Sequence, residues 1–394
     1  MTLLLPDPAR ATGPAPLVVP AAAPPNPRTG PILHVDLGAV AANTRTFATR
    51  TTGAVMAVVK ADGFGHGAPA AAATALAHGA SWLGVTSIGE GLALRDAGLH
   101  APVLSWLNPV EADYAAAIGR RLDLAVADLD HLEAVSRAGI GARVHLHLDT
   151  GMARDGCAPD AWAALCRAAR RLEVQGVLRV VGMMGHLGCA DVPDDPANSR
   201  GRTVFGWGLG QARAAGLRPP LRHLAATAAT LTDPASHHTM SRIGAGLVGI
   251  DPSRSTPLAA ALTLTAPVVA TRRVPTGTSV GYGHTWVAER PTRLALLPLG
   301  YADGLPRAAS ARAEVLLRGR RRRVVGRISM DQTVIDLGDD DAAPGEVAVV
   351  FGPGGQGEPL VSEWASWSDT IEHEIVTGIG ARVARRTTPA GGNR

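Results

Sequence analysis

The sequence predicts an α/β protein in which a (β/α)8 barrel of the TIM type is followed by a mainly antiparallel β domain. Two observations predict this fold class. Between residues 31 and 257, short apolar runs alternate with alanine-rich helical stretches, whereas from residue 258 to 394 short β-prone runs follow one another without helices between them. The first pattern is typical of a parallel sheet covered by helices, and the second of antiparallel pairing.

Residues 1–30 precede the barrel and are rich in proline and alanine. Proline removes a backbone donor and blocks both helix and sheet hydrogen bonding, so we expect a disordered tail. A secretory signal is not expected, because no basic start precedes the apolar stretch and prolines interrupt it.

The barrel is predicted from the number of its apolar runs, which are ILHVDL, AVMAVVKA, SWLGVT, PVLSWL, LDLAVAD, RVHLHLD and VVGMMGHL. Seven or eight such strand and helix units favour a closed barrel over an open sheet. Lys60, Asp149, Arg154 and His186 each lie at or just past the C-terminal end of a predicted strand. This is the end of the barrel where active sites form, so we expect these side chains to meet there.

The second domain is predicted from the runs LTLTAPVVATRRV, TRLALLPLG, AEVLLRG, RRVVGRISM, QTVIDL and EVAVVFG, which are separated by Gly, Pro and Asp turns. Its densest charge run comprises Arg318 and residues 320–323, all arginine. We interpret this run as a solvated hairpin edge, where charge discourages pairing with another strand.

Composition excludes several classes of partner. A formal net charge of +4 with 4% aromatic residues lacks the stacking platforms of a nucleic-acid-binding face. No apolar run approaches the ~18 residues of a membrane span. Cys157, Cys166 and Cys189 have spacings of neither a disulfide framework nor a zinc site, which predicts free thiols in a reducing cytoplasm and no metal.

Lysine usage singles out one candidate for chemistry. The 38 Lys and Arg residues include a single lysine, Lys60. Arginine replaces lysine wherever only positive charge is needed, but it cannot serve as a nucleophilic amine. The alternative is a surface lysine retained by chance, and its neighbours argue against that alternative.

Lys60 lies in AVVKADGFGHGA (57–68), where a β run ends at the lysine and glycines follow. This string resembles the cofactor-lysine motif of the alanine racemase family, which are fold type III enzymes dependent on pyridoxal 5′-phosphate. The resemblance implies that Lys60 carries the cofactor as a Schiff base and acts as one of two catalytic bases. Desolvation at the barrel mouth would lower the amine pKa, as that chemistry requires.

Two further barrel motifs resemble the same family. LDTGMARDG (148–156) matches the loop whose arginine approaches the cofactor and the substrate carboxylate, which implies that role for Arg154. GMMGHLGCAD (182–191) implies that His186 bridges the cofactor arginine and the catalytic tyrosine.

RHLAATAAT and SRIGAGLVGIDP resemble the family's phosphate and pyridine-nitrogen region. The match implies that Thr227 and the backbone amides of Gly244 and Ala245 hold the phosphate. It places Arg242 opposite the pyridine nitrogen. Because arginine only donates hydrogen bonds, the ring nitrogen would stay unprotonated, which limits side reactions such as transamination.

The C-terminal motifs complete the resemblance. SVGYGHTW (279–286) implies that Tyr282 is the second base and that it enters from a neighbouring subunit of a homodimer, with active sites at the interface. The segments LPLGYADGLPR and GRISMDQ imply substrate contacts by Tyr301, Met330 and Asp331, with Asp303 and Asp331 each open between a turn and a site role. Taken singly, each residue could be structural, and only their joint order favours the site.

Four positions depart from the family pattern. Phe64 and Ala381 stand where the family usually has tyrosines that reach the phosphate, so cofactor retention is expected to weaken. His147 replaces a lysine, often carbamylated, that positions the arginine matching Arg154, so a chloride, a water or His147 itself must do so. Ser329 replaces a common cysteine, with little expected effect.

The resulting prediction is racemisation of an amino acid, alanine first, by Lys60 and Tyr282. A racemase for serine or a larger amino acid, a related aldolase or decarboxylase, and a non-catalytic cofactor carrier are the alternatives. An aldolase of this fold type would need a metal, and Glu372, His373 and Glu374 leave that option open.

Overall fold

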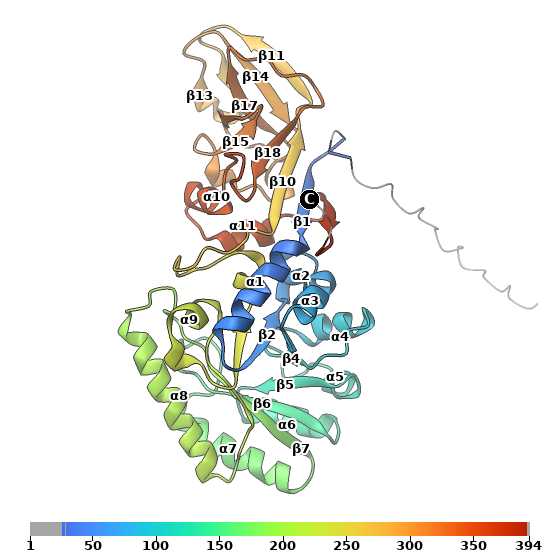
Figure 1. The fold of residues 1–394 in the computed structure, drawn as a ribbon, viewed down its shortest axis with the longest axis vertical. Helices are drawn as coiled ribbons and strands as arrows, with labels where there is room; N and C mark the ends of the chain where they lie inside the picture. The colour runs from blue at the N-terminus through green and yellow to red at the C-terminus, as the bar shows by residue number, and fades with distance from the viewer. Residues whose placement is uncertain (1–25, 28, 392–394) are drawn as a thin grey trace, which may run out of the picture.

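The computed structural model describes residues 26, 27 and 29–391, and most of the predicted tail, residues 1–25 and 28, lies outside the described residues. Two domains follow one another along the long axis of the molecule, with the barrel domain below and the C-terminal domain above (Figure 1). The domain boundaries at 31–257 and 258–394 stay a prediction.

The barrel domain is built on parallel strands in the order β8-β7-β6-β5-β4-β3-β2-β9. The strands β2 to β9 are Ala54–Val58, Trp82–Val85, Val103–Ser105, Leu122–Val126, Ala142–His147, Leu178–Met184, Leu221–His223 and Met240–Ile243. Strands β2 and β9 pair in parallel, and the amides of Thr239 and Arg242 donate to the carbonyls of Arg222 and Ala225 across the β8–β9 seam. The predicted TIM-type barrel is therefore confirmed.

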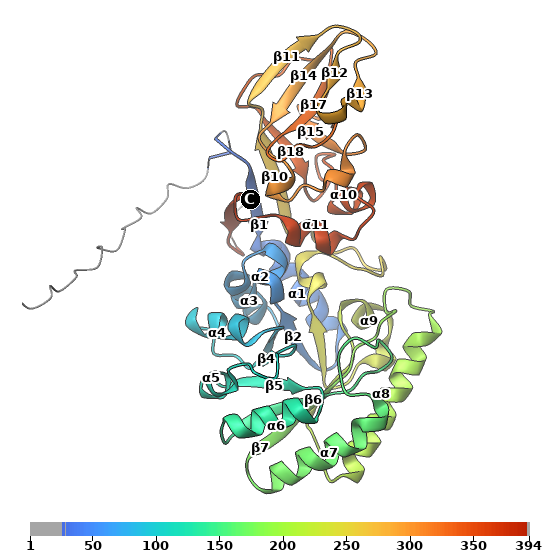
Figure 2. The ribbon, with the colours of Figure 1, turned by 180° about the vertical axis from the view of Figure 1, so that it is seen from behind.

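Helices cover the outside of the barrel strands (Figures 1 and 2). Some of them begin at a capping side chain: Asp128 accepts from the His131 amide at the start of α6, and Ser87 accepts from the Glu90 amide at the start of α4. The helices are α1 (Leu37–Arg50), α2 (Lys60–Gly65), α3 (Ala68–Ala77), α4 (Ile88–Asp96), α5 (Tyr114–Gly119), α6 (Leu129–Ala138), α7 (Pro159–Val174), α8 (Pro196–Ala214) and α9 (Thr227–Thr232), with short 3₁₀ helices η1 (Pro234–Ser236) and η2 (Ala245–Val248).

The first apolar run, ILHVDL, does not lie in the barrel, and this part of the prediction was wrong. Strand β1 (Ile32–Asp36) pairs antiparallel with β10 (Leu262–Pro267) and parallel with β19 (Ala384–Thr388) of the C-terminal domain. Residues 54–243 already supply the eight barrel strands. An apolar run specifies a buried strand but not the sheet that receives it.

The C-terminal domain contains a six-stranded sheet in the order β16-β15-β18-β10-β1-β19, a three-stranded sheet β11-β14-β17 and a hairpin β12-β13. Every pair except β1–β19 is antiparallel, which confirms the predicted domain class. Its remaining elements are β11 (Ala270–Val274), β12 (Ser279–Val280), η3 (Tyr282–His284), β13 (Trp286–Val287), β14 (Thr292–Leu297), η4 (Tyr301–Asp303), η5 (Arg307–Ala309), β15 (Glu314–Leu317), β16 (Arg320–Arg323), β17 (Thr333–Gly338), β18 (Val347–Phe351), α10 (Val361–Trp367) and α11 (Glu372–Gly378).

The arginine run forms the predicted hairpin edge. Strand β16 pairs only with β15 in the six-stranded sheet and ends that sheet. Arg320 and Arg322 pair with Asp340, and Arg321 pairs with Glu363. The edge charges are thus matched locally by carboxylates of the same domain.

Three observations complete the picture of the described residues. Helix α11 packs against α2, where a Cβ on Gly65 would lie 2.7 Å from the Val376 carbonyl oxygen, so the two domains meet beside Lys60. Cys157, Cys166 and Cys189 are free, as predicted. None of the helices in the described part of the chain has the length and apolar character of a membrane span.

Candidate active site

Lys60 stands at the mouth of the barrel, two residues after β2 ends at Val58. Its side chain is partly buried. Burial lowers the pKa of the Lys60 amine, the charge on Arg154 lowers it further, and the carboxylate of Glu90 acts in the opposite sense. The amine therefore loses its proton more readily than an exposed lysine.

The backbone after Lys60 makes a left-handed turn. Ala61, Asp62, Gly63 and Phe64 have φ values of 52°, 53°, 63° and 58°. For a residue with a Cβ this conformation costs roughly 1–2 kcal/mol, so other contacts must hold it. The Gly63 amide donates to the Val59 carbonyl at 2.9 Å, and Asp62 Oδ1 accepts from the Ala68 amide at 2.8 Å.

Arg154 lies exposed on the loop between β6 and α7. Asp149 shapes this loop, because its Oδ1 accepts from the amides of Gly151 and Met152, both at 2.9 Å. The buried His147 places Nδ1 3.3 Å from Oδ2 of Asp155, the neighbour of Arg154. His147 lowers the pKa of Asp155. His147 therefore acts on the Arg154 loop through Asp155.

Arg242 on β9 is buried, and both of its terminal amino groups have hydrogen-bond partners within the barrel. It donates to the carbonyls of His223 at 2.8 Å and Gly185 at 2.6 Å, and its nitrogens lie 3.0 Å from His223 Nδ1 and 3.2 Å from His186 Nδ1. Burial lowers the pKa of Arg242 to about 10, so the group stays a cation near neutral pH. Arginine only donates, so both histidine nitrogens facing it must accept.

The two histidines are accordingly neutral. Burial lowers the pKa of His186 to about 3, with Arg242 and Arg154 adding to the effect. Burial followed by the charge of Arg242 also puts the pKa of His223 well below its usual value. His186 thus presents a neutral ring between the buried cation and the barrel mouth.

A chain of polar contacts continues from His223 across the barrel interior. His223 Nε2 lies 2.8 Å from His145 Nδ1, His145 Nε2 lies 3.2 Å from Asp123, and Asp123 accepts from Arg143 at 2.8 Å. Because His223 Nδ1 accepts from Arg242, its proton sits on Nε2 and is donated to His145, which then donates to Asp123. The sequence pattern did not predict His145, His223 or Asp123, and of the three only His145 lies in the alternating run RVHLHLD.

A glycine loop after β9 lies against Thr227, where the sequence predicts an anion site. The amides of Gly244 and Gly246 converge on Oγ1 of the buried Thr227, at 3.3 and 3.2 Å. A Cβ on Gly244 would lie 2.8 Å from Cζ of Phe64, and one on Gly246 2.4 Å from the ring of Phe47. A side chain at either glycine would therefore clash with one of these phenylalanine rings.

These residues fit pyridoxal 5′-phosphate. Loop amides and a threonine hydroxyl are donors suited to a phosphate, and the partly buried amine of Lys60 suits an aldehyde. Phe64 closes the loop with its ring edge and offers no hydroxyl, as the sequence reading expected. Ala381 is exposed and offers no polar group either.

The structure does not bring the remaining predicted residues to Lys60 within one chain. Tyr282, in η3 between β12 and β13, is 71% exposed. In both views the β12–β13 hairpin lies in the upper domain, separated from α2 by the rest of that domain (Figures 1 and 2).

Tyr301, Met330 and Asp331 form a second group in the C-terminal domain. The Ala302 amide donates to the Met330 carbonyl at 2.9 Å, which joins the two segments. Arg382 ties the group together through Asp303 at 3.1 Å and Asp331 at 2.7 Å. Asp303 is buried and also accepts from the Gly300 amide at 2.8 Å, which identifies it as a turn residue.

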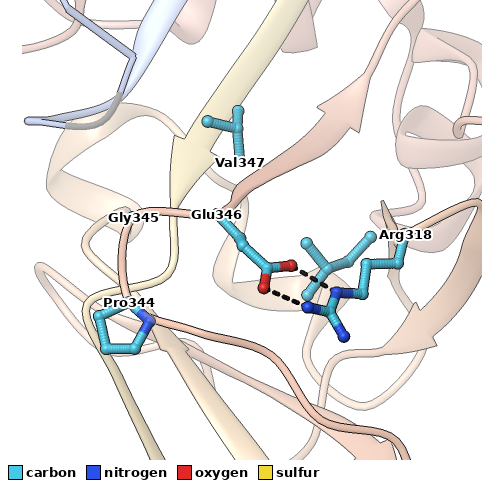
Figure 3. Close-up of a pocket in the computed structure, with 6 residues that line it drawn as sticks. Arg318, Pro344, Gly345, Glu346 and Val347 are labelled. Atoms are coloured by element: carbon cyan, nitrogen blue, oxygen red, sulfur yellow. Dashed lines mark hydrogen bonds and ion pairs between the residues drawn. The ribbon is translucent and has the colours of Figure 1, made fainter.

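Two other features lie outside this site. In the shallow pocket beside Pro344 and Gly345, Arg318 donates two hydrogen bonds to Glu346, each 2.6 Å (Figure 3). Arg318 is thus fully engaged. Among the described residues no group of three His, Cys, Asp or Glu side chains is arranged to hold a metal, the sequence around His373 included.

Comparisons with known proteins cover both domains. A family described as "Alanine racemase, N-terminal domain" matches residues 35–252, and "Alanine racemase, C-terminal domain" matches residues 261–387. The chain is 45% identical over 365 residues to the alanine racemase of Thermobifida fusca, covering 91% of this chain and 98% of that one. It is 44% identical over 368 residues to that of Streptomyces coelicolor, with 89% and 94% covered.

Solved structures of alanine racemases superpose on both domains of this chain. The alanine racemase of D-cycloserine-producing Streptomyces lavendulae superposes with a TM-score of 0.90 at 41% identity, covering 92% of this chain and 98% of that one. The enzyme of Bacillus anthracis superposes with a TM-score of 0.85 at 28% identity, with 94% and 97% covered.

Proposed function

The chain belongs to the alanine racemase family of pyridoxal 5′-phosphate-dependent isomerases, and from that premise we propose that Lys60 and Tyr282 are the two bases with which it interconverts L- and D-alanine. One observation carries these assignments. The only lysine of the chain lies at the barrel mouth, partly buried, with a lowered pKa. An amine in that state can accept and return a proton near neutral pH.

The cofactor is held by Lys60, Thr227, Arg242 and the glycine loop that includes Gly244 and Ala245. When bound, pyridoxal 5′-phosphate supplies an aldehyde that condenses with amines and a ring that withdraws electrons from the substrate Cα. The convergence of the Gly244 and Gly246 amides on Thr227 supports the phosphate assignment.

Near neutral pH, Arg242 stays charged and His186 stays neutral. Arg242 remains a cation that only donates, so a pyridine nitrogen facing it accepts and carries no proton. His186, whose pKa burial lowers to about 3, takes no proton from substrate near neutral pH. It orients groups at the mouth as a neutral ring, and proton transfer is left to Lys60 and the tyrosine.

Racemisation requires a base on each face of a planar Cα. Lys60 is fixed on one face by its strand end, and we assign it the proton of the D-enantiomer. Tyr282 takes the proton of the L-enantiomer from the opposite face. Its exposure of 71% and its distance from Lys60 in the fold support a homodimer in which each copy lends Tyr282 to the other's barrel.

Substrate binding is assigned to Arg154, Tyr301, Met330 and Asp331. A guanidinium fork matches a carboxylate, and Arg154 is exposed and close enough to Lys60 for its charge to lower the pKa of that amine. Tyr301 and Met330 are 42% and 52% exposed on the C-terminal domain, where they would face a partner's barrel.

The compartment proposed for the enzyme is the reducing cytoplasm. Its three thiols are free, and burial raises the pKa of Cys157 to about 11 and of Cys166 to about 12, which leaves these two unreactive.

The experiment that tests the function is exchange of the alanine α-proton for deuterium by the cofactor-loaded protein, extended to the other amino acids. The parent should exchange and racemise alanine in both directions, whereas Tyr282→Phe should exchange the D-enantiomer through Lys60 without net racemisation. Tyr114→Phe, a buried tyrosine that donates to the Pro109 carbonyl outside the site, is the control. Two-way racemisation by Tyr282→Phe at the parent rate would contradict the assignment.

A further inference from the structure

Glu90 binds the backbone directly after Lys60. Its Oε1 accepts a hydrogen bond from the Ala61 amide at 2.7 Å. Its Oε2 accepts from the Thr86 amide at 2.9 Å, the Thr86 hydroxyl at 3.0 Å and the Ser87 amide at 3.2 Å. One carboxylate thus joins the end of β3 and the start of α4 to the residue that follows the lysine.

These contacts exceed what capping of α4 requires. The Glu90 bond to the Ser87 amide, with the Ser87 hydroxyl accepting from the Glu90 amide, already completes a capping box. The bond to Ala61 spans 29 positions in the chain and uses the other oxygen. Although burial alone would raise it, the hydrogen bonds from Ala61, Thr86 and Ser87 lower the pKa of Glu90, so the group is a fixed anion.

The Ala61 bond acts on Lys60 through a rigid unit. The peptide between Lys60 and Ala61 is planar, so fixing its N–H fixes the plane attached to the Lys60 Cα. On the other side, the Val59 amide donates to the Gly84 carbonyl at 2.9 Å. Lys60 is therefore held between a sheet hydrogen bond before it and Glu90 after it, at the start of a left-handed turn.

We propose that Glu90 is a positioning residue for Lys60, aiming its amine through the Ala61 peptide and balancing its charge at the barrel mouth. The proposal rests on the proposed role of Lys60. The other charged or titratable groups that face Lys60 are Arg154 from the β6–α7 loop, His186 after β7 and His373 in α11. Glu90 is the one anion in this set, and the direction of its effect on the Lys60 pKa agrees with the proposal.

The test uses the fact that Lys60 is the only lysine. The full chain freed of cofactor is labelled with acetic anhydride across a pH series, and the modified Lys60 peptide is quantified by mass spectrometry, apart from the α-amine. In Glu90→Gln we expect the Lys60 titration about one pH unit lower, because the nearby opposite charge is gone. Attachment of added cofactor, trapped by borohydride reduction, should be about tenfold slower because the amine is less well aimed.

Glu90→Asp keeps the negative charge on a shorter side chain. The Lys60 titration should therefore return to that of the parent, while attachment of the cofactor stays slow. Glu133→Gln is the matched control, since Glu133 is a carboxylate on another barrel helix, α6, that pairs only with Arg137. A Glu90→Gln protein whose Lys60 titrates and reacts like the control would overturn the proposal.

A measurement on the unaltered protein covers the case in which the variants do not fold. The Ala61 amide should exchange slowly with deuterium, because it donates a hydrogen bond to the fixed Glu90 carboxylate. Exchange at the rate of an open loop amide would overturn the proposal. If the parent instead labels as expected but attaches no cofactor, the racemase assignment of Lys60 fails while the result for Glu90 stands.

Discussion

A substitution at Phe64 that adds one hydroxyl tests how the cofactor is anchored. Its ring is 7% exposed, and its Cζ lies against Gly244 of the phosphate loop. Phe64→Tyr would add a hydroxyl at that atom, next to the loop amides. One neutral hydrogen bond contributes about 0.5–1.5 kcal/mol, so we expect two- to tenfold slower loss of cofactor on dilution.

The control is the melting temperature of the cofactor-free protein, because Phe64 also packs 6.1 Å from His373, ring centre to ring centre. An unchanged melting temperature with slower cofactor loss assigns the gain to the new hydroxyl. Faster loss from an equally stable protein would show that the phosphate does not lie beside Phe64.

For single residues, the sequence predicted the position of those that follow strand ends in recognisable strings, such as Lys60 after β2 and His186 after β7. It did not predict Glu90, His145 or His223, because each acts through a partner that lies far along the chain. Glu90 bonds to Ala61 across 29 positions and His145 meets His223 across 78. A contact of that kind leaves no local pattern in one sequence.

The left-handed turn of α2 holds three residues that carry a Cβ at positive φ, a conformation that costs free energy. Ala61 has a φ of 52°, a region that glycine enters freely. Ala61→Gly keeps the amide that Glu90 accepts from and removes the Cβ clash. Relief of the strain stabilises the folded chain, whereas the greater freedom of glycine stabilises the unfolded chain. The expected net gain in free energy of unfolding is about 0.5–1 kcal/mol.

Ala73→Gly is the control, and its change in free energy of unfolding should have the opposite sign. Ala73 is exposed in the middle of α3, where glycine should destabilise by about 1 kcal/mol. Denaturant titration of both variants measures the two effects. A loss of stability in Ala61→Gly equal to that in Ala73→Gly would mean that Ala61 is not strained.

At the element scale the barrel strands β2 to β7 were predictable because parallel strands buried on both faces are nearly continuous apolar runs. Strand β1 has the same character, with Leu33 and Val35 fully buried, yet it lies in the other sheet between β10 and β19. Only the pairing partners distinguish the two cases, and these lie more than 200 residues away.

Across the whole molecule, several buried histidines make stability depend on pH. Burial lowers the pKa of His186 to about 3 and of His66 to about 4, against an ordinary value of 6.5. Below pH 6.5 the unfolded chain takes up these protons and the folded chain does not, so stability falls as pH falls toward 4. At pH 5 each such histidine costs about 2 kcal/mol.

We therefore expect the free energy of unfolding to drop steeply between pH 7 and 5, and His186→Asn to flatten that slope. Asparagine can still offer an oxygen to Arg242 but takes up no proton. His100→Asn, at an exposed position, is the control and should leave the slope unchanged. A slope identical in His186→Asn and the parent would contradict the neutral state of His186.

The proposed exchange of Tyr282 between subunits has a consequence that only a two-chain experiment can reveal. Neither Lys60→Ala nor Tyr282→Phe should racemise alanine alone, yet a dimer with one copy of each contains one barrel with both native residues. Purified through two different affinity tags, such mixed dimers should recover roughly half the activity of the parent dimer. If Lys60 and Tyr282 worked within one chain, every site of the mixed dimer would lack one base, and activity would stay at the level of the single variants. Recovery in the mixture, with none in either parent variant, would therefore require that the active site span two copies of this chain.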